Sequence, residues 1–130
     1  MIQKWWNKFF KSDVHEDVET PEGVEARFVL VYHALEIGTL TLRNGEWVFA
    51  YSKAFKAQTT IKPLINFPSK EKTYRSTVLW PFFLHRIPGT AQPRVQNIIR
   101  KEQIDPTNPV ALLRRFGEQT IANPFRLRMV

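Results

Sequence analysis

Residues 37–52 read IGTLTLRNGEWVFAYS, and this stretch decides the fold. Asn44 and Gly45 lie between two runs in which apolar and polar side chains alternate. Alternation at a period of two predicts a strand with one buried face. Asn-Gly suits a two-residue type I′ turn, because both central residues of that turn need positive φ. The stretch therefore predicts two antiparallel strands joined by a tight hairpin turn.

Neighbouring segments extend this hairpin into a small sheet. Residues 26–34, ARFVLVYHA, are rich in β-branched and aromatic side chains and predict a further, largely buried strand. Residues 125–129 alternate apolar side chains with arginines and predict a closing strand. Between them, residues 53–75 contain Pro63 and Pro68, which restrict any strand there to a short piece or an edge.

The C-terminal half carries helical patterns, and three helices are predicted over residues 78–87, 93–103 and 109–120. Ser76 or Thr77 is expected to cap the first helix, with Pro81 in its first turns, and Asn108 to cap the third. Strands first and helices later predict the α+β class, an antiparallel sheet or partial barrel packed with about three helices.

The N-terminal 24 residues have a different composition and are predicted to lie outside the folded domain, which spans residues 25–130. Residues 1–11 are expected to form a short amphipathic helix, and residues 12–24 an acidic linker. The helix would act as a hydrophobic arm on a partner or on the domain's own core. A membrane surface is the alternative, because two tryptophans and two phenylalanines accompany three lysines there.

No run in the chain is long enough to span a bilayer, and the N-terminus lacks the apolar core of a signal peptide. A cytoplasmic protein is therefore expected. The net charge is +7, and residues 47–130 hold fourteen Lys and Arg against four acids. Such a basic body favours an acidic protein surface or nucleic acid as partner, although a merely solvated surface explains the charge equally well.

Catalytic motifs are missing from the sequence. The five glycines are too far apart for a phosphate-binding loop, and there is no cysteine. His15, His33 and His85 never occur at metal-ligand spacing, and no serine stands in a nucleophile-elbow context. The sequence therefore predicts a protein that is not an enzyme and that holds no cofactor and no metal.

Residues 76–89, STVLWPFFLHRIPG, provide the candidate binding surface. Trp80, Phe83, Leu84 and Ile87 recur at helical spacing, which predicts that Phe83 and Ile87 face the core and leaves Trp80 open. Side chains off this stripe are expected to point outward, where aromatic and arginine residues are typical interface anchors. The predicted partner-binding residues are Trp80, Phe82, His85, Arg86, Pro88, Gly89 and Arg94.

The order of these segments resembles the N-terminal subdomain of HipA-type toxin kinases over residues 27–128. The resemblance is carried by IGTLTL, the Asn-Gly hairpin, PLINFP, Phe82-Phe83, Arg86-Ile87-Pro88, Leu112-Leu113, Phe116-Gly117 and Phe125-Arg126-Leu127. Two positions depart from the family pattern. Leu84-His85 stands where an Asp-Asn pair is common, and Gly89-Thr90 stands where an acidic residue often follows the turn proline.

The chain stops at Val130, where a HipA protein would continue into its kinase body. It is therefore similar to the freestanding, HipS-like antitoxins of three-component HipBST systems. That resemblance implies a HipT-like serine/threonine kinase as the partner to be neutralised, and a HipB-like DNA-binding protein as a further component. The alternative is a basic nucleic-acid-binding module or a DNA-binding co-repressor component; the pair of predicted helices around DPTNP lacks the usual tight glycine turn of a helix-turn-helix.

Overall fold

The structure is a computed structural model, and it describes residues 20–130. The predicted helix over residues 1–11 and most of the predicted acidic linker lie outside the described residues. In the described part of the chain, no helix is long and apolar enough to cross a membrane.

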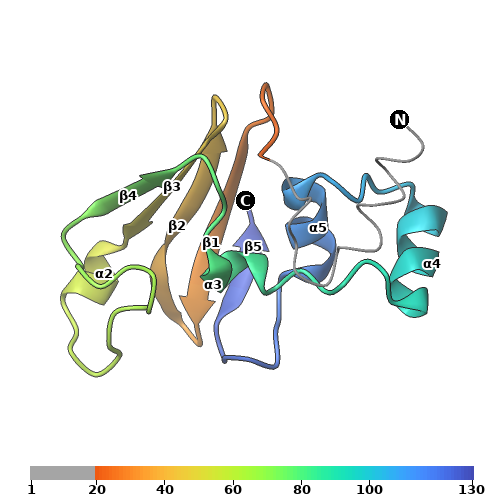
Figure 1. Ribbon diagram of the computed structural model, residues 1–130. Coiled ribbons are helices and arrows are strands. Elements are labelled where there is room, and N and C mark those ends of the chain that lie inside the picture. Colours follow the sequence, from red (N-terminus) through yellow and green to blue (C-terminus); the bar gives the residue numbers. More distant parts are fainter. Residues whose placement is uncertain (1–19) are drawn as a thin grey trace.

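A five-stranded antiparallel sheet, in the order β4-β3-β2-β1-β5, forms one side of the molecule, and α5 and α4 lie on the other (Figure 1). The strands are β1 (Ala26–Tyr32), β2 (Leu35–Arg43), β3 (Glu46–Tyr51), β4 (Thr73–Ser76) and β5 (Arg126–Met129). The predicted hairpin is confirmed, because Leu42 pairs with Trp47 and the turn residues Asn44 and Gly45 have φ of 54° and 73°. The sheet stays open, since β4 and β5 each form one of its edges.

Alternation along β2 and β3 gives the sheet one buried face, while β1 is buried on both faces over residues 28–31. Phe28, Leu40, Trp47 and Phe49 are at most 1% exposed and belong to one core cluster. Gly38 lies where β2 and β3 approach closely. A Cβ built there would lie 2.5 Å from the carbonyl oxygen of Ala50 and 2.8 Å from the Phe49 ring, so only glycine fits without a shift.

Four helices lie in the described residues: α2 (Lys53–Lys56), α3 (Pro81–Leu84), α4 (Pro93–Glu102) and α5 (Pro109–Phe116). The predicted second and third helices are confirmed as α4 and α5, although α5 ends at Phe116, before residue 120. Asn108 caps α5 as expected, its side-chain oxygen accepting from the backbone N–H of Val110 at 3.0 Å. The one-turn helix α2, capped by Ser52, was not predicted. With sheet and helices together, the α+β class is confirmed.

The first predicted helix is wrong in length. Instead of residues 78–87, helix α3 covers a single turn that begins at Pro81, and neither Ser76 nor Thr77 caps it. The physical reason is Pro81 itself, which disfavours helical backbone at the preceding residue. Trp80 is accordingly extended, with φ −66° and ψ 150°. Ser76 belongs to β4.

The buried face of the sheet is closed by α3 and by the loop over residues 61–67. Figure 1 shows α3 in front of the sheet, with α5 and then α4 beside it. Leu112 of α5 and Val95 of α4 are fully buried in the same core cluster as the inner side of the sheet. The helices therefore extend the hydrophobic core beyond strand β5.

Candidate partner-binding surface at helix α3

Helix α3 is anchored in the core by one side chain. Phe83 is fully buried, and its ring centroid lies 5.6 Å from that of Phe49 and 5.9 Å from that of Phe67. Ile87 is also buried, so the prediction that Phe83 and Ile87 face the core is confirmed. Because Phe83 points inward, its neighbour Phe82 is turned toward the surface and is half-buried.

The loop over residues 61–67 lies directly against the N-terminus of α3. The side-chain oxygen of Asn66 accepts from the backbone N–H of Phe82 at 2.9 Å. This contact satisfies one N–H of the first turn, a group that lacks a partner within the helix. Phe67 makes an edge-to-face ring contact with Trp80, with centroids 4.9 Å apart. Ile65, which directly precedes Asn66 in this loop, is 87% exposed.

Tyr51 holds this loop in place. Its hydroxyl donates to the carbonyl oxygen of Phe67 at 2.6 Å and accepts from the backbone N–H of Leu64 at 2.8 Å. Burial raises the pKa of Tyr51 to about 12, with the backbone hydrogen bond from Leu64 acting in the opposite direction. The loop that carries Ile65 is thus fixed to strand β3 on both sides of its exposed side chain.

Together these elements present a mostly apolar surface. We call it the α3 surface and define it by Ile65, Val78, Trp80, Pro81, Phe82, Leu84 and His85, all of them exposed or half-buried. Ile65 and Val78 are two of the five large apolar side chains that are exposed in the described part of the chain. Exposed apolar side chains that gather around one element are typical of sites that bind another protein.

Arg86 does not belong to this surface, and the expectation that it points outward is wrong. The side chain is only 3% exposed and makes hydrogen bonds to the loop over residues 117–125. Its Nε–H donates to the carbonyl oxygen of Gly117 at 2.6 Å, and Nη2 donates to those of Glu118 at 2.9 Å and Phe125 at 2.6 Å. Nη1 donates to the side-chain oxygen of Asn123 at 3.4 Å.

The surroundings of Arg86 explain its burial. All four of these hydrogen bonds go to neutral oxygens, and burial lowers the pKa of the guanidinium to about 10. A buried guanidinium is tolerated only where its N–H groups find acceptors. Here three backbone carbonyls from a distant part of the chain provide them, and Arg86 fastens the end of α3 to the approach of β5.

The other predicted binding residues divide into two groups. Trp80, Phe82 and His85 lie on the α3 surface, where the first two are half-buried and His85 is exposed. Pro88 and Gly89 are half-buried in the connection that leads to α4. Arg94 is exposed on α4, which Figure 1 shows at the far side of α5 from the sheet, so it is separate from the α3 surface.

Ile65 and Val78 were not predicted as surface residues. A signal for Ile65 exists in the sequence, since PLINFP places Leu64 and Phe67 around it and two prolines limit the backbone. Both Leu64 and Phe67 are buried, so a loop with these two anchors must turn Ile65 outward. Nothing comparable marks Val78, whose exposure follows from the turn that the Ser76 side chain forms with its backbone.

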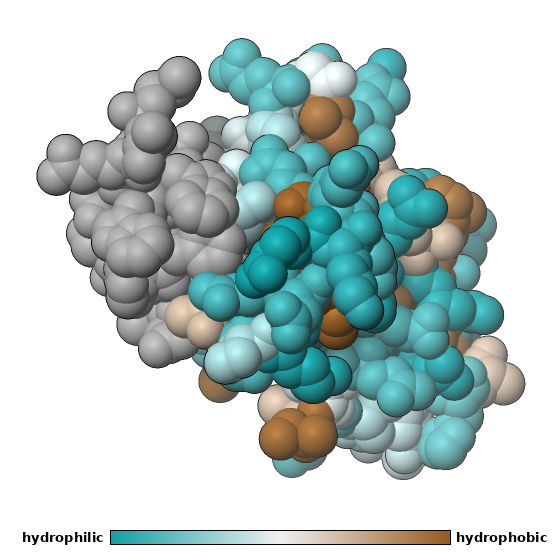
Figure 2. All heavy atoms as spheres, turned by 90° about the vertical axis from the view of Figure 1, so that its right-hand side faces the viewer, coloured by the Kyte–Doolittle hydropathy of each residue, from teal (hydrophilic) through white to brown (hydrophobic). Residues whose placement is uncertain are grey.

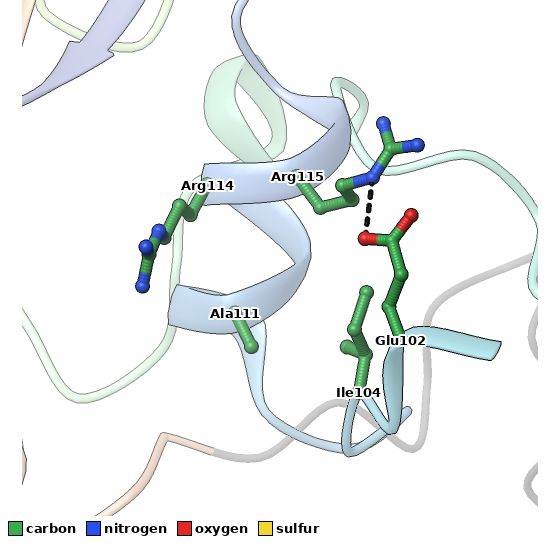
Figure 3. A pocket seen from close by; sticks show the side chains of 5 residues that line it. All are labelled: Glu102, Ile104, Ala111, Arg114 and Arg115. Atoms are coloured by element: carbon green, nitrogen blue, oxygen red, sulfur yellow. Dashed lines mark hydrogen bonds and ion pairs between the residues drawn. The ribbon is translucent and has the colours of Figure 1, made fainter. Parts of the chain in front are cut away.

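The opposite end of the molecule has a different character. Figure 2 shows the side on which α4 lies, and hydrophilic residues dominate it. A hollow of about 360 Å³ between α4 and α5 is lined by Glu102, Ile104, Ala111, Arg114 and Arg115. The Nε–H of Arg115 donates to Glu102 at 2.8 Å across it, and this hydrogen bond raises the pKa of Arg115. The side chain of Arg114 extends away from this pair (Figure 3). No group of three potential metal ligands occurs within residues 20–130.

Comparison with known families identifies the family of the chain. The family of HipA N-terminal domains matches residues 29–122, which is more than half of the chain. The chain belongs to the HipA N-terminal domain family. The predicted resemblance is therefore confirmed at the level of the family, and the match includes the hairpin, the loop that carries Ile65, and α3. The matched family is the N-terminal domain of HipA and not its kinase domain. No curated protein matches the chain.

Proposed function

We propose that this HipA N-terminal domain is a non-catalytic, HipS-like antitoxin that binds a HipT-like serine/threonine kinase and neutralises it. The observation that carries the proposal is the α3 surface, an exposed apolar surface on a domain whose family accompanies a kinase. A domain of this kind has a surface complementary to the kinase body, and the same contact can form between separate chains.

The α3 surface has the physical properties of a protein-binding site. Trp80 and Phe82 are half-exposed aromatic side chains, the residue class that contributes most to protein interfaces. Phe82 is held by the backbone bond to Asn66 and by the burial of Phe83. A surface that is already ordered loses little conformational entropy on binding, which leaves more of the contact energy as affinity.

The charge of the domain favours the same kind of partner. The described residues carry sixteen Lys and Arg and eight Asp and Glu, a net charge of +8 over residues 20–130. An acidic region on the kinase would raise the association rate by electrostatic steering, and raised salt would lower that rate. The bound domain then neutralises the kinase because it covers part of the kinase surface.

Co-expression with a HipT-like kinase tests the proposal. The two chains are expected to purify as a complex, and kinase autophosphorylation is expected to fall as the domain is added to saturation. Unchanged autophosphorylation in a saturated complex would overturn neutralisation alone. Failure to form any complex would overturn kinase binding as well.

A basic nucleic-acid-binding module, alone or as a co-repressor component with a HipB-like protein, is the second candidate. Four exposed cations on α4 and α5 favour it, since none of them forms an ion pair within residues 20–130: Arg94, Arg100, Lys101 and Arg114. A gel shift across a salt series separates the candidates. Phosphate binding predicts an affinity that falls linearly with salt on a double logarithmic plot, without any kinase present.

A further inference from the structure

The loop between α5 and β5 presents a single isoleucine to solvent. Ile121 is fully exposed, at 109% of the reference area, and it exceeds every other large apolar side chain in the described part of the chain. Ala122 beside it is also exposed. A side chain this exposed adds nothing to the core, so the fold itself does not account for an isoleucine at this position.

The loop that carries Ile121 is held rigidly on both sides. Arg86 bonds to Gly117 and Glu118 before the tip, and to Asn123 and Phe125 after it. The backbone N–H of Leu127 donates to the carbonyl oxygen of Glu118 at 2.9 Å. These contacts close the loop at its base and leave only the tip free of contact with the core.

The tip has bonds of its own. Thr120 and Asn123 pair across the turn, and the Thr120 hydroxyl accepts from the backbone N–H of Ala122 at 3.3 Å. Asn123 Oδ1 also accepts from the backbone N–H of Phe125 at 3.1 Å. Isoleucine is in addition stiff about χ1 because it is β-branched. Burying Ile121 in a partner would therefore cost little ordering of either the loop or the side chain.

The surroundings of Ile121 define the chemistry of its partner. Uncharged polar side chains flank it at Gln119, Thr120 and Asn123. The charged pair nearest in sequence, Glu118 and Arg126, is already joined by an ion pair of 2.7 Å. A hollow of about 210 Å³ lies beside the tip, lined by Gln119, Thr120, Asn123, Pro124, Phe125 and Arg126. These surroundings fit an apolar pocket with an uncharged polar rim on another protein.

This loop is continuous with the α3 surface. The ring of Phe125 lies 6.1 Å from that of Phe82 and 5.7 Å from that of Tyr32, centroid to centroid. Arg86, whose side chain holds the loop, lies four residues after Phe82 in the chain. A protein that covers Phe82 therefore reaches the base of the loop without crossing another element.

We propose that Ile121 is a second anchor for the protein that binds the α3 surface and that it inserts into an apolar pocket of that protein. The inference rests on the proposed function, which names a HipT-like kinase as this protein. It adds a contact that lies near the end of the matched family region and outside the stretch of residues 76–94 in which binding residues were predicted.

Titration of the kinase with full-length variants tests the inference. Because Ile121 makes no core contact, Ile121→Ala and Ile121→Asp are expected to fold as the wild type does, with unchanged thermal unfolding. Ile121→Ala is expected to weaken kinase binding by about tenfold, the loss that corresponds to removing most of a buried isoleucine, and Ile121→Asp by more. Ala54→Asp serves as the matched control, because Ala54 is exposed on α2 and its substitution adds the same charge away from the loop.

Each result of this titration has a separate meaning. Wild-type affinity in Ile121→Asp would overturn the inference and leave the proposed function intact. An equal loss in Ile121→Asp and Ala54→Asp would also overturn it, because the effect would then come from charge alone. If the wild-type domain itself does not bind the kinase, the proposed function fails, and the inference fails with it.

Discussion

Arg86 and Phe125, thirty-nine positions apart, are joined by a hydrogen bond of 2.6 Å from the guanidinium to the carbonyl oxygen. This bond connects the end of α3 to the start of β5. It brings the half-buried ring of Phe125 next to Phe82, and it fixes the base of the loop that carries Ile121. One buried arginine therefore positions both parts of the proposed binding region.

Replacing Arg86 by methionine is expected to lower the free energy of unfolding by about 3 kcal/mol. The carbonyl oxygens of Gly117 and Phe125 would lose the Arg86 donor, while that of Glu118 would keep the N–H of Leu127, and each buried group left unsatisfied costs about 1–3 kcal/mol before the site relaxes. Urea unfolding measures the loss. Arg94→Met, on the exposed face of α4, is the control and is expected to change stability by less than about 0.5 kcal/mol. Similar values for the two variants would contradict the assignment of Arg86 as the residue that holds the loop.

Tyr51 is expected to ionise at a higher pH than an unperturbed tyrosine. Its pKa is about 12 in the folded protein against 10.0 for an unperturbed tyrosine, and the hydroxyl is bonded to the loop over residues 61–67. Since the folded state holds this proton more tightly, Tyr51 contributes stability that is full below pH 10 and is lost as the pH rises toward 12. Absorbance of tyrosinate during an alkaline titration measures this ionisation.

The variant Tyr51→Phe isolates this effect. Arg86 acts with the opposite sign in the same alkaline range, because its lowered pKa of about 10 makes the unfolded state bind the extra proton. Comparison of wild type with Tyr51→Phe cancels the arginine contribution. The variant is expected to lose about 1–2 kcal/mol at neutral pH and to show a smaller loss of stability between pH 10 and 12. The same pH dependence in both proteins would rule out this role of Tyr51.

Gly38→Ala is expected to destabilise the protein by about 2–3 kcal/mol, through a clash that overpacks the core. The added methyl group would meet the carbonyl oxygen of Ala50, a backbone atom in the paired strand. Gly23→Ala is the control: it has positive φ but no atom within 4 Å, so only the backbone cost of about 1–2 kcal/mol applies. Thermal or urea unfolding ranks the two variants, and a smaller loss for Gly38→Ala would show that β2 and β3 separate easily.

Ile65→Asp and Phe82→Ala are expected to weaken kinase binding by at least tenfold, because both side chains lie on the α3 surface. Ile65 is 87% exposed, so its replacement leaves the fold unchanged. Phe82 keeps its backbone bond to Asn66 when its ring is removed. Val48→Asp, on the face of the sheet that is opposite to α3, is the control for added charge. Unchanged affinity in both test variants would show that the kinase does not bind at the α3 surface.

Local signals in the sequence determined much of this fold. Asn44-Gly45 with its alternating flanks predicts the hairpin, because turn geometry and side-chain alternation depend on adjacent residues alone. Asn108 predicts the start of α5 for the same reason. The order of motifs from IGTLTL to Phe116-Gly117 was enough to indicate the HipA N-terminal domain family, and Phe83 and Ile87 were correctly predicted as core.

Tertiary structure decided the rest, and above all which side of residues 76–89 is exposed. Helical periodicity placed Arg86 outside, yet carbonyl groups thirty-one to thirty-nine positions away draw it into the interior. Pro81 shortened the helix, and the loop over residues 61–67 supplied Ile65 and the bond to Phe82. A sequence pattern contains information only about residues that are close together along the chain. The burial of a charged group depends instead on acceptors that the folded chain brings to it, and this is why the predicted anchor Arg86 supports the binding surface from within.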